Sequence, residues 1–231
     1  MLDRIVPTGV AVVEAFSDDP QATVYPDERA AITKAVPKRQ REFATARACA
    51  RAALARLGES PVSIPRGMHG EPQWPEGITG SITHCDGYRA AAVARLRDTA
   101  SLGVDAELNE ILPDGVLDLI ALAEESDHVA ALAVTEPGIC WDRLLFCAKE
   151  SVYKAWFPLT QRWLDFSEAH VTIDPVERTF SARLLVPGPL IAGAPLNVLD
   201  GRWLADRGLL ATAIAVRQPS VQGQHVAHSP D

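Results

Sequence analysis

Apolar residues recur at helical spacing in two long segments of the chain. The first segment has five of them three or four positions apart: Phe43, Ala46, Ala50, Leu54 and Leu57. This spacing predicts a helix that begins near Pro37 and ends at Leu57, where Gly58 follows as a C-cap residue. The second segment predicts a helix from Trp141 to Trp156, with Pro158 expected to stop it.

Between and around these helices, short β-branched or alternating segments predict strands. Residues 5–16 form one, and residues 81–84 and 90–96 flank a Cys85-Asp86-Gly87 turn as a hairpin. An amphipathic helix is expected at about 113–123, whereas residues 124–140 are less periodic. Further strands are predicted at 101–108, 169–174, 180–186, 202–206 and 209–217.

The two halves of the chain resemble each other weakly. Residues 80–95 and 201–217 both have the pattern strand, tight turn, strand, and one long helix precedes the hairpin in each half. Two related α/β lobes would explain this similarity. Residues 218–231 lack an apolar pattern, so we expect a flexible tail there.

Composition places the chain among ordinary globular proteins. Its 231 residues are 47% hydrophobic and 23% charged, which excludes global disorder and collagen-like or coiled-coil designs. No apolar run approaches the roughly 20 residues of a transmembrane helix, and the first residues lack the apolar core of a signal peptide. Four cysteines in a chain of this size are not a disulfide framework. We therefore expect a cytoplasmic protein without a membrane association.

The net charge of −8 is unevenly distributed. Residues 29–56 contain eight basic side chains and one acid, Glu42, so this segment carries +7 and the remainder −15. An acidic protein with one basic segment is not typical of nucleic-acid binding, and instead suits a discrete polyanion or an acidic partner protein. A helix with a solvated basic face is the alternative.

Asp105 and Glu107 lie two positions apart in a predicted strand and therefore point to the same side. Two converging carboxylates repel each other unless a hard cation such as Mg²⁺ lies between them. An exposed strand face with alternating acids is the alternative reading of this pair.

The segment from Phe146 to Trp156 combines aromatic residues with charges. Glu150 and Lys154 are spaced as an i, i+4 pair, which a surface salt bridge would also explain. Lysines on a largely buried aromatic helix need a reason to be there, and ammonium groups near a cation-binding acid are suited to hold a pyrophosphate.

Four glycines and three prolines make residues 65–80 an irregular loop. Arg66 in this loop, and Ser81 and His84 after it, offer hydrogen-bond donors to phosphate oxygens. His84 taken alone is typical of a hydrogen-bonded structural histidine. The run His84-Cys85-Asp86 does not indicate a thiol-protease triad, because neighbours along a strand point to opposite faces.

Three motifs in this order resemble the 4′-phosphopantetheinyl transferases of the surfactin/enterobactin type: RGMHGEP…GSITH, LGVDAE and FCAKESVYKAW. The extension of the last motif through FPLT to RWLDF is most similar to actinobacterial members that activate polyketide and mycolate-type synthases. The resemblance spans about residues 29–217.

The resemblance implies an α/β (α+β) fold with two pseudo-symmetric lobes. Each lobe would be a small, mostly antiparallel sheet packed on a long helix, with coenzyme A bound in the cleft between the lobes. The lobes would comprise residues 1–100 and 101–217, and the protein would be a monomer.

The resemblance also implies a set of site residues. Mg²⁺, or alternatively Mn²⁺, would bind at Asp105, Glu107 and Glu150. The coenzyme A phosphates would lie near Arg39, Arg47, Arg66, Ser81, His84, Lys149 and Lys154. The chain departs from the family pattern at His69, where a basic residue is common in the loop motif, and at Ala106, where isoleucine is common.

The implied activity is transfer of the 4′-phosphopantetheine group from coenzyme A to a serine of apo acyl or peptidyl carrier proteins. Adenosine 3′,5′-bisphosphate would be released, and the carriers would belong to fatty-acid, polyketide, non-ribosomal peptide or siderophore synthases. Glu150 is the expected general base, with a metal-bound water as the alternative, and Lys149 and Lys154 would stabilise developing charge. Arg41 and Arg51 are candidates for docking the carrier.

Two other functions remain open from the residues alone. One is a Mg²⁺-dependent phosphohydrolase that uses the same carboxylates with water as the nucleophile. The other is a non-catalytic module that binds coenzyme A or an acidic partner. The sequence does not identify which carrier proteins are served.

Overall fold

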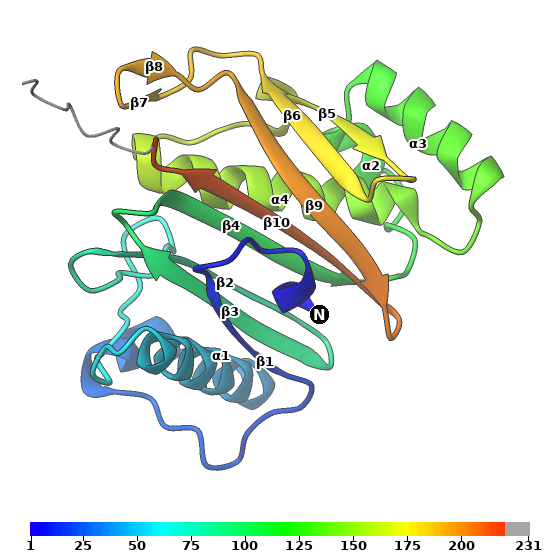
Figure 1. Ribbon diagram of the computed structural model, residues 1–231. Helices are drawn as coiled ribbons and strands as arrows, with labels where there is room; N and C mark the ends of the chain where they lie inside the picture. Colours follow the sequence, from blue (N-terminus) through cyan, green and yellow to red (C-terminus); the bar gives the residue numbers. More distant parts are fainter. Residues whose placement is uncertain (220–231) are drawn as a thin grey trace, which may run out of the picture.

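The computed structural model describes residues 1–219 and shows two antiparallel sheets, each packed against one long helix (Figure 1). The first sheet has the strand order β1-β3-β2. Helix α1 packs on it and begins at Pro37, whose fixed φ suits a first helical position. The bounds are Ala11–Ala15 for β1, Ile78–Cys85 for β2, Tyr88–Arg95 for β3 and Pro37–Arg56 for α1.

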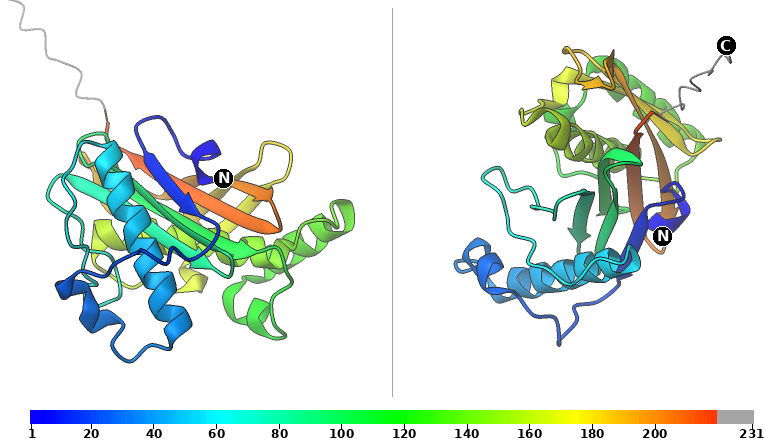
Figure 2. Two further views of the ribbon diagram at one scale, coloured as in Figure 1. Left: turned by 90° about the horizontal axis from the view of Figure 1, so that it is seen from below. Right: turned by 60° about the vertical axis from the view of Figure 1, so that its left-hand side comes forward.

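The second sheet has the strand order β4-β10-β9-β6-β5, and α4 packs across β4 and β10. The right-hand view of Figure 2 shows α1 and α4 at opposite ends of the molecule with strands between them. The bounds are Thr99–Leu108 for β4, Ala169–Asp174 for β5, Thr179–Leu184 for β6, Val198–Asp206 for β9, Leu209–Arg217 for β10 and Trp141–Thr160 for α4.

Shorter elements connect the two sheets and their helices. Three are 3₁₀ helices: η1 at Leu2–Arg4, η2 at Pro26–Ala31 and η3 at Phe166–Glu168. Two are α-helices, α2 at Val116–Ile120 and α3 at Ala123–Thr135. A small two-stranded ribbon pairs β7 at Leu190–Ile191 with β8 at Ala194–Pro195. No helix among the described residues is long and apolar enough to cross a membrane.

Side-chain hydroxyls join the two sheets where β2 lies against β4. Ser81 Oγ accepts a hydrogen bond from the Val104 N–H at 3.0 Å, and Thr83 Oγ1 accepts one from the Ala106 N–H at 3.0 Å. Ser81 and Thr83 are two positions apart, so they lie on the same face of β2. The two hydroxyls thus satisfy N–H groups of β4 that no backbone partner from β2 reaches.

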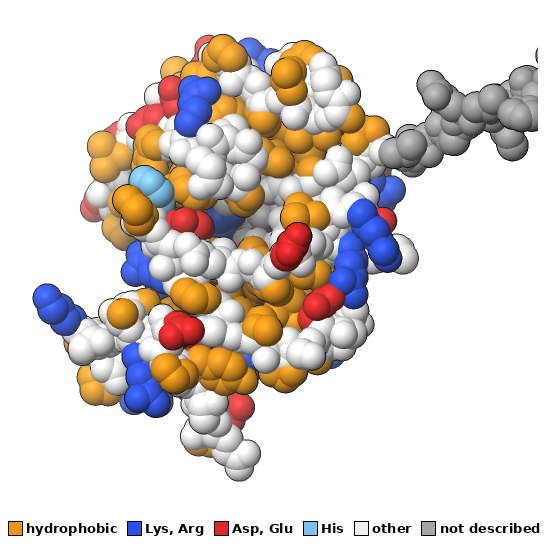
Figure 3. All heavy atoms as spheres, turned by 90° about the vertical axis from the view of Figure 1, so that its left-hand side faces the viewer, with side chains coloured by type: hydrophobic (Ala, Val, Ile, Leu, Met, Phe, Trp, Pro, Cys, Tyr) orange, Lys and Arg blue, Asp and Glu red, His pale blue; other side chains and the backbone are white. Residues whose placement is uncertain are grey.

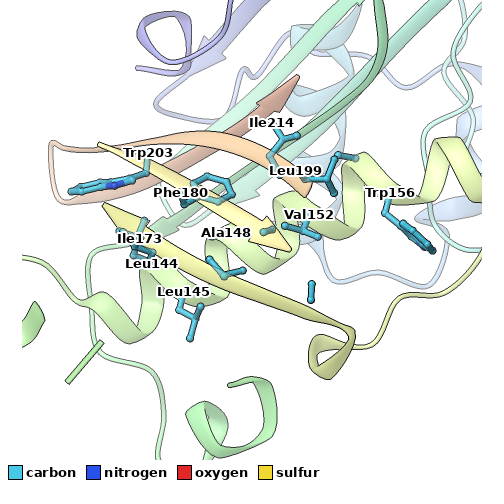
Figure 4. Close-up of a cluster of buried hydrophobic side chains, with 14 of the residues drawn as sticks. Leu144, Leu145, Ala148, Val152, Trp156, Ile173, Phe180, Leu199, Trp203 and Ile214 are labelled. Atoms are coloured by element: carbon cyan, nitrogen blue, oxygen red, sulfur yellow. The ribbon is translucent and has the colours of Figure 1, made fainter. Parts of the chain in front are cut away.

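Three apolar clusters form the core. The largest lies between α4 and the five-stranded sheet, where a helical stripe from Leu144 through Ala148 and Val152 to Trp156 meets Phe180 and other sheet residues (Figure 4). A second cluster includes alanines of β3, β4 and β10 under the N-terminal segment, so it spans both sheets. The third packs α1 on β3. The shared second cluster makes the two sheets one body.

The structure confirms an α/β fold with antiparallel sheets and helices. It places α1 within one residue of its predicted end and reproduces the hairpin and the strands at 169–174 and 209–217. In the predicted strand at 5–16 only Ala11–Ala15 pairs, because Pro7 and the left-handed Gly9 interrupt the extended chain. Residues 220–231, most of the predicted flexible tail, lie outside the described residues.

Two helix predictions were wrong. Pro158 does not stop α4, which continues to Thr160. The Thr160 hydroxyl donates to the Trp156 carbonyl at 3.1 Å and the Gln161 N–H donates to the Phe157 carbonyl at 2.8 Å. These bonds satisfy the last carbonyls of the helix and support the turn that contains the proline.

The helix expected at 113–123 is instead the short α2, and residues 124–140 contain most of α3. The apolar period of α3 is hidden because Glu125 occupies one of its inward-facing positions. The Glu125 carboxylate accepts the Leu122 N–H at 2.7 Å, which caps the start of the helix.

Gly103 allows β4 to approach α4 closely. A Cβ at this position would lie 2.0 Å from the Ser151 carbonyl oxygen and 2.7 Å from the Ala155 nitrogen, both in the backbone of α4. Backbone atoms cannot move aside as a flexible side chain can. The glycine therefore fixes the distance between the strand and the helix.

We expect Gly103→Ala to lower the free energy of unfolding by about 3 kcal/mol, because α4 must move away from β4. Urea-induced unfolding followed by circular dichroism measures this loss. Gly138→Ala is the matched control, since a Cβ there meets nothing within 4 Å and should have little effect. Equal stabilities of the two variants would contradict the packing argument.

Candidate functional site

A pocket of about 770 Å³ opens between the two helices and the seam of the sheets. Its walls come from α1, the 66–74 loop, β2, β4 and α4, so residues from both sheets line it. Figure 3 shows the hollow on one face of the molecule, with charged side chains near it and apolar side chains on its rim. The predicted site residues in its lining are Arg39, Arg47, Arg66, Ser81, His84, Asp105, Glu107, Glu150 and Lys154.

Asp105 anchors the acidic part of the pocket. Its Oδ1 accepts hydrogen bonds from Thr83 Oγ1 at 2.9 Å and from Lys154 Nζ at 2.7 Å. The side chain is buried, and its other oxygen, Oδ2, has no hydrogen-bond partner. A buried carboxylate oxygen without a partner is costly for the protein unless a ligand satisfies it.

Two further carboxylates of the pocket, Glu107 and Glu150, have raised pKa values. Burial and the nearby charge of Asp105 raise the pKa of Glu107 to about 7, although Arg143 Nη1 lies 3.3 Å from its Oε2. Burial also raises the pKa of Glu150, with Asp105 adding to the effect and Lys154 opposing it. Both shifts come from acids held together in a poorly solvated place.

These features fit a hard divalent cation. A cation between the three carboxylates would pair with Asp105 Oδ2 and remove the repulsion that raises the pKa of Glu107. Within residues 1–219, however, no three acid, histidine or cysteine side chains are already arranged to hold a metal. Lys154 and Arg143 pair with two of the carboxylates instead, so a cation would have to compete with these ammonium and guanidinium groups.

Arginines and a histidine form the basic part of the pocket. The Arg47 side chain is buried, its Nε donates to the Ile64 carbonyl at 2.7 Å, and its guanidinium lies 4.3 Å from the centre of the Phe43 ring. Burial lowers the pKa of Arg47 to about 10, which leaves it charged at neutral pH. Arg39 pairs with Glu42 at 3.3 Å and also contacts the imidazole of His84.

His84 is a neutral imidazole at physiological pH. Burial, followed by the positive charges of Arg39 and Lys154, lowers the pKa of His84 to about 4. It can therefore give one N–H and accept one hydrogen bond, but it adds no charge to the basic cluster.

The 66–72 loop closes one side of the pocket. The Gly67 N–H donates to the Glu71 carbonyl at 2.8 Å, and Gly70 has a φ of +97°, which favours glycine. The imidazole of His69 contacts the Phe157 ring of α4, with the ring centres 5.3 Å apart. His69 thus links this loop to the helix that carries Glu150.

Comparison with known protein families finds matches along most of the chain. Residues 27–94 match the 4′-phosphopantetheinyl transferase N-terminal domain, and residues 101–189 match the 4′-phosphopantetheinyl transferase superfamily. The chain is 52% identical to 4′-phosphopantetheinyl transferase Svp of Streptomyces mobaraensis, over 95% of this chain and 91% of that protein. It is 47% identical to PptT of Mycobacterium tuberculosis, over 90% of this chain and 92% of the relative.

The chain belongs to the 4′-phosphopantetheinyl transferase superfamily. The resemblance inferred from the three motifs is confirmed, including its actinobacterial character, since a 49% identical relative comes from Nocardia iowensis. Enterobactin synthase component D of Salmonella austin is a weaker match, 34% identical over 52% of this chain and 48% of that protein.

Lys149 does not reach the pocket of this phosphopantetheinyl transferase. Its ammonium group pairs with Glu125 at 2.8 Å and donates to the carbonyls of Phe166 at 2.7 Å and Ala169 at 2.9 Å. Consecutive residues of an α-helix point about 100° apart, so Lys149 faces a different side of α4 from Glu150. Its predicted roles in phosphate binding and catalysis are therefore corrected.

Arg51 is also placed differently from its predicted role in carrier docking. It is buried and pairs with Glu28 at 2.9 Å, so no partner protein can contact it. Arg41 is exposed and lies 3.6 Å from Asp18, and its role in docking stays a prediction. Ser81 lines the pocket, but its hydroxyl also accepts the Val104 N–H.

Sequence reasoning missed several contributors to the site of the transferase. Thr83 contacts Asp105 directly, and its position two residues after Ser81 was the available signal. Arg143 pairs with Glu107 from the first turn of α4, where nothing local in the sequence indicates this contact. Trp74 lines the pocket and donates from Nε1 to the Gly80 carbonyl at 3.0 Å.

The pKa of His84 predicts how the protein responds to acid. Its pKa is about 4 when folded, compared with the ordinary 6.5, so only the unfolded state takes up this proton as the pH falls from 6.5 to 4. The folded state therefore loses stability over this range. We expect His84→Asn, which cannot be protonated there, to show a smaller fall in melting temperature between pH 7 and pH 5.

Thermal unfolding by calorimetry at several pH values measures this difference. A proton NMR titration gives an independent check, because the ring protons of His84 should not shift until the pH approaches 4. Titration near pH 6.5, or identical pH slopes in both proteins, would contradict the burial argument.

Proposed function

We propose that this transferase moves the 4′-phosphopantetheine group of coenzyme A to a serine hydroxyl of apo acyl or peptidyl carrier proteins. The observation that carries this proposal is one pocket with carboxylates, among them the buried Asp105, and Lys154 in one part and arginines in another. Coenzyme A carries its pyrophosphate and its 3′-phosphate at separate positions. The two charged parts of the pocket suit these two groups, the first through Lys154 and a cation on the carboxylates, the second through the arginines. Family membership and about 50% identity to named transferases support the same reaction.

The proposed carriers belong to fatty-acid, polyketide, non-ribosomal peptide or siderophore synthases, and the enzyme would act as a monomer. The name enterobactin synthase component D, carried by a weaker relative, supports the siderophore connection. Exposed Arg41, near the start of α1, is the proposed contact for an acidic carrier.

The pocket would catalyse the reaction mainly by holding the two substrates and their charges in place. Arg39 and Arg47 would hold the 3′-phosphate, with the neutral His84 as a hydrogen-bond partner. Arg66 would bind a coenzyme A phosphate from the 66–72 loop. Lys154 would stabilise the charge that develops on the leaving phosphate oxygens.

Glu150 is the proposed general base. Burial and Asp105 raise the pKa of Glu150, which makes its carboxylate a better proton acceptor than an exposed glutamate. It would take the proton of the serine hydroxyl as the serine oxygen bonds to the pantetheine-side phosphorus. The bond from this phosphorus to the bridging oxygen breaks, and adenosine 3′,5′-bisphosphate leaves.

Asp105, Glu107 and Glu150 would hold the divalent cation, Mg²⁺ or Mn²⁺. When bound, this cation supplies positive charge to the pyrophosphate. The unpartnered Asp105 Oδ2 is the observation on this structure that supports a cation here.

A transfer assay tests the proposed function. We expect the protein, incubated with coenzyme A, Mg²⁺ and an apo carrier protein, to raise the carrier's mass by one phosphopantetheine group. Asp105→Asn should lower this rate by roughly 100-fold or more, because it weakens the cation site while keeping a side chain of the same size beside Lys154. Intact-protein mass spectrometry of the carrier gives both results.

The same assay separates the alternatives. Hydrolysis of coenzyme A without a change in carrier mass would indicate a phosphohydrolase, and intact coenzyme A across several carriers would indicate a binding module. Full activity of Asp105→Asn, with the fold confirmed by circular dichroism, would contradict the proposed metal ligands.

The raised pKa of Glu107 predicts a pH-dependent effect of Mg²⁺ on stability. Without metal, the folded state keeps the Glu107 proton up to about pH 7, whereas the unfolded state releases it near 4.5. Stability of the metal-free protein therefore falls as the pH rises through this range. Mg²⁺ binds the deprotonated form, so the increase in melting temperature over an EDTA sample should grow between pH 5.5 and pH 7.5.

At Mg²⁺ concentrations about 100 times the Kd, we expect an increase of roughly 5–10 °C at the higher pH. Glu107→Gln should reduce the pH dependence of this increase, whereas Glu124→Gln, at an exposed position of α3, should keep it. A metal-induced increase that is equal at all pH values would contradict the assignment of Glu107.

A further inference from the structure

Glu28 is a fully buried carboxylate that lies outside the pocket lining. It belongs to η2, and it accepts four hydrogen bonds: from the Tyr25 N–H at 2.9 Å, from the Ile64 N–H at 2.8 Å and from Arg51 Nη1 at 2.9 and 3.2 Å. Both carboxylate oxygens are therefore occupied by the protein itself. Such a group has no capacity left for a ligand, so its role must be exerted on its neighbours.

The first neighbour is the wall of the pocket. Ala31 and Ile32, at the end of η2, line the pocket. Glu28 ties η2 to α1 through Arg51, which also donates from Nη2 to the Thr23 carbonyl at 2.6 Å and lies over the Tyr25 ring at 4.3 Å. This wall is thereby fixed relative to the helix that carries Arg39 and Arg47.

The second neighbour is the segment that leads to the pocket loop. Glu28 holds the N–H of Ile64, and Arg47 holds the carbonyl of the same residue at 2.7 Å. Arg66, which also lines the pocket, follows two residues later. One buried residue, Ile64, thus connects Glu28 to both arginines.

The third effect is electrostatic. Arg39, Arg51 and Arg66 all disfavour the positive charge of Arg47, and Glu28 favours it. Glu28 is therefore a buried counter-charge next to a group of four guanidinium groups. It neutralises Arg51, and Arg39 pairs with Glu42. Within the described residues, Arg47 and Arg66 have no carboxylate partner, so their charge is left to an anionic ligand.

The five-stranded half of the protein contains a matching arrangement around Glu125. This buried carboxylate accepts the Leu122 N–H at 2.7 Å and the Val171 N–H at 2.6 Å, and it pairs with Lys149 of α4 at 2.8 Å. In both cases the glutamate caps a helix, pairs with a cation on the long helix and fixes the chain that follows that long helix. Only the Glu28 arrangement connects to pocket arginines.

We propose that Glu28 is a positioning residue that sets the arginine cluster and the η2 wall for the 3′-phosphate of coenzyme A. It acts through Ile64 and Arg51, without touching the ligand. The proposal rests on the proposed function for the identity of the ligand. Glu28 thus determines how strongly the pocket prefers a ligand with a 3′-phosphate, although it is remote from the reacting atoms.

Calorimetric titration with coenzyme A and with dephospho-coenzyme A, which lacks the 3′-phosphate, tests the proposal. We expect Glu28→Gln to raise the Kd for coenzyme A about tenfold and to change the Kd for dephospho-coenzyme A less than about twofold, because only the former has the phosphate that the arginines bind. In transfer assays, KM for coenzyme A should rise while kcat stays nearly constant.

Glu125→Gln is the matched control, since it removes the same charge from a similarly buried glutamate that also caps a helix and pairs with a cation of the long helix. It should lower the melting temperature as Glu28→Gln does, yet keep the wild-type preference for coenzyme A over dephospho-coenzyme A. If Glu28→Gln does not fold, the double variant Glu28→Gln/Arg51→Gln replaces it, because that variant leaves no unpaired buried charge.

An unchanged preference in a folded Glu28 variant would overturn the proposal, as would equal losses of preference in the Glu125 control. A wild-type protein that does not distinguish the two ligands would also overturn it. If neither Glu28 variant folds, Glu28 serves stability alone and the positioning role is refuted. Failure of the proposed function looks different: the wild type would then bind coenzyme A selectively but leave every apo carrier unmodified.

Discussion

The contact between β2 and β4 is the constraint on which the rest of the structure depends. The two strands belong to different sheets, and the hydroxyls of Ser81 and Thr83 satisfy the N–H groups of β4 between them. Thr83 also donates to Asp105 Oδ1. The group that joins the two sheets therefore also orients the first carboxylate of the site, so the fold cannot close correctly without placing Asp105 in the pocket.

The acidic part of the pocket is arranged at a cost to the free protein. Burial and the nearby charge of Asp105 raise the pKa values of Glu107 and Glu150, and one Asp105 oxygen has no partner. Lys154 and Arg143 offset part of this cost by pairing with Asp105 and Glu107. Groups that are unfavourable without a ligand and are not satisfied elsewhere are typical of binding sites, because ligand binding relieves the strain.

Much of this arrangement could be predicted from the sequence, since it follows local rules. Helix α1 follows its apolar period, and Asp105 and Glu107 reach one pocket because a strand places alternate residues on one side. The position of the Lys149 side chain could not be predicted from local rules, because it pairs with Glu125, which is distant in the sequence. The same inward-facing Glu125 hid the period of α3. The errors at Lys149 and α3 thus arose where a buried charge replaced an apolar residue.

These buried charges also explain how two similar halves came to differ in chemistry. Glu28 with Arg51 and Glu125 with Lys149 each fix a long helix to the chain that follows it, so both are parts of the framework. Around the first pair the neighbouring helix positions hold arginines, and around the second they hold an acid and another lysine. A framework that is stabilised by its own internal ion pairs leaves the adjacent helix face free to carry different charges. One half can therefore carry arginines at the pocket while the other carries acids, without either losing its fold.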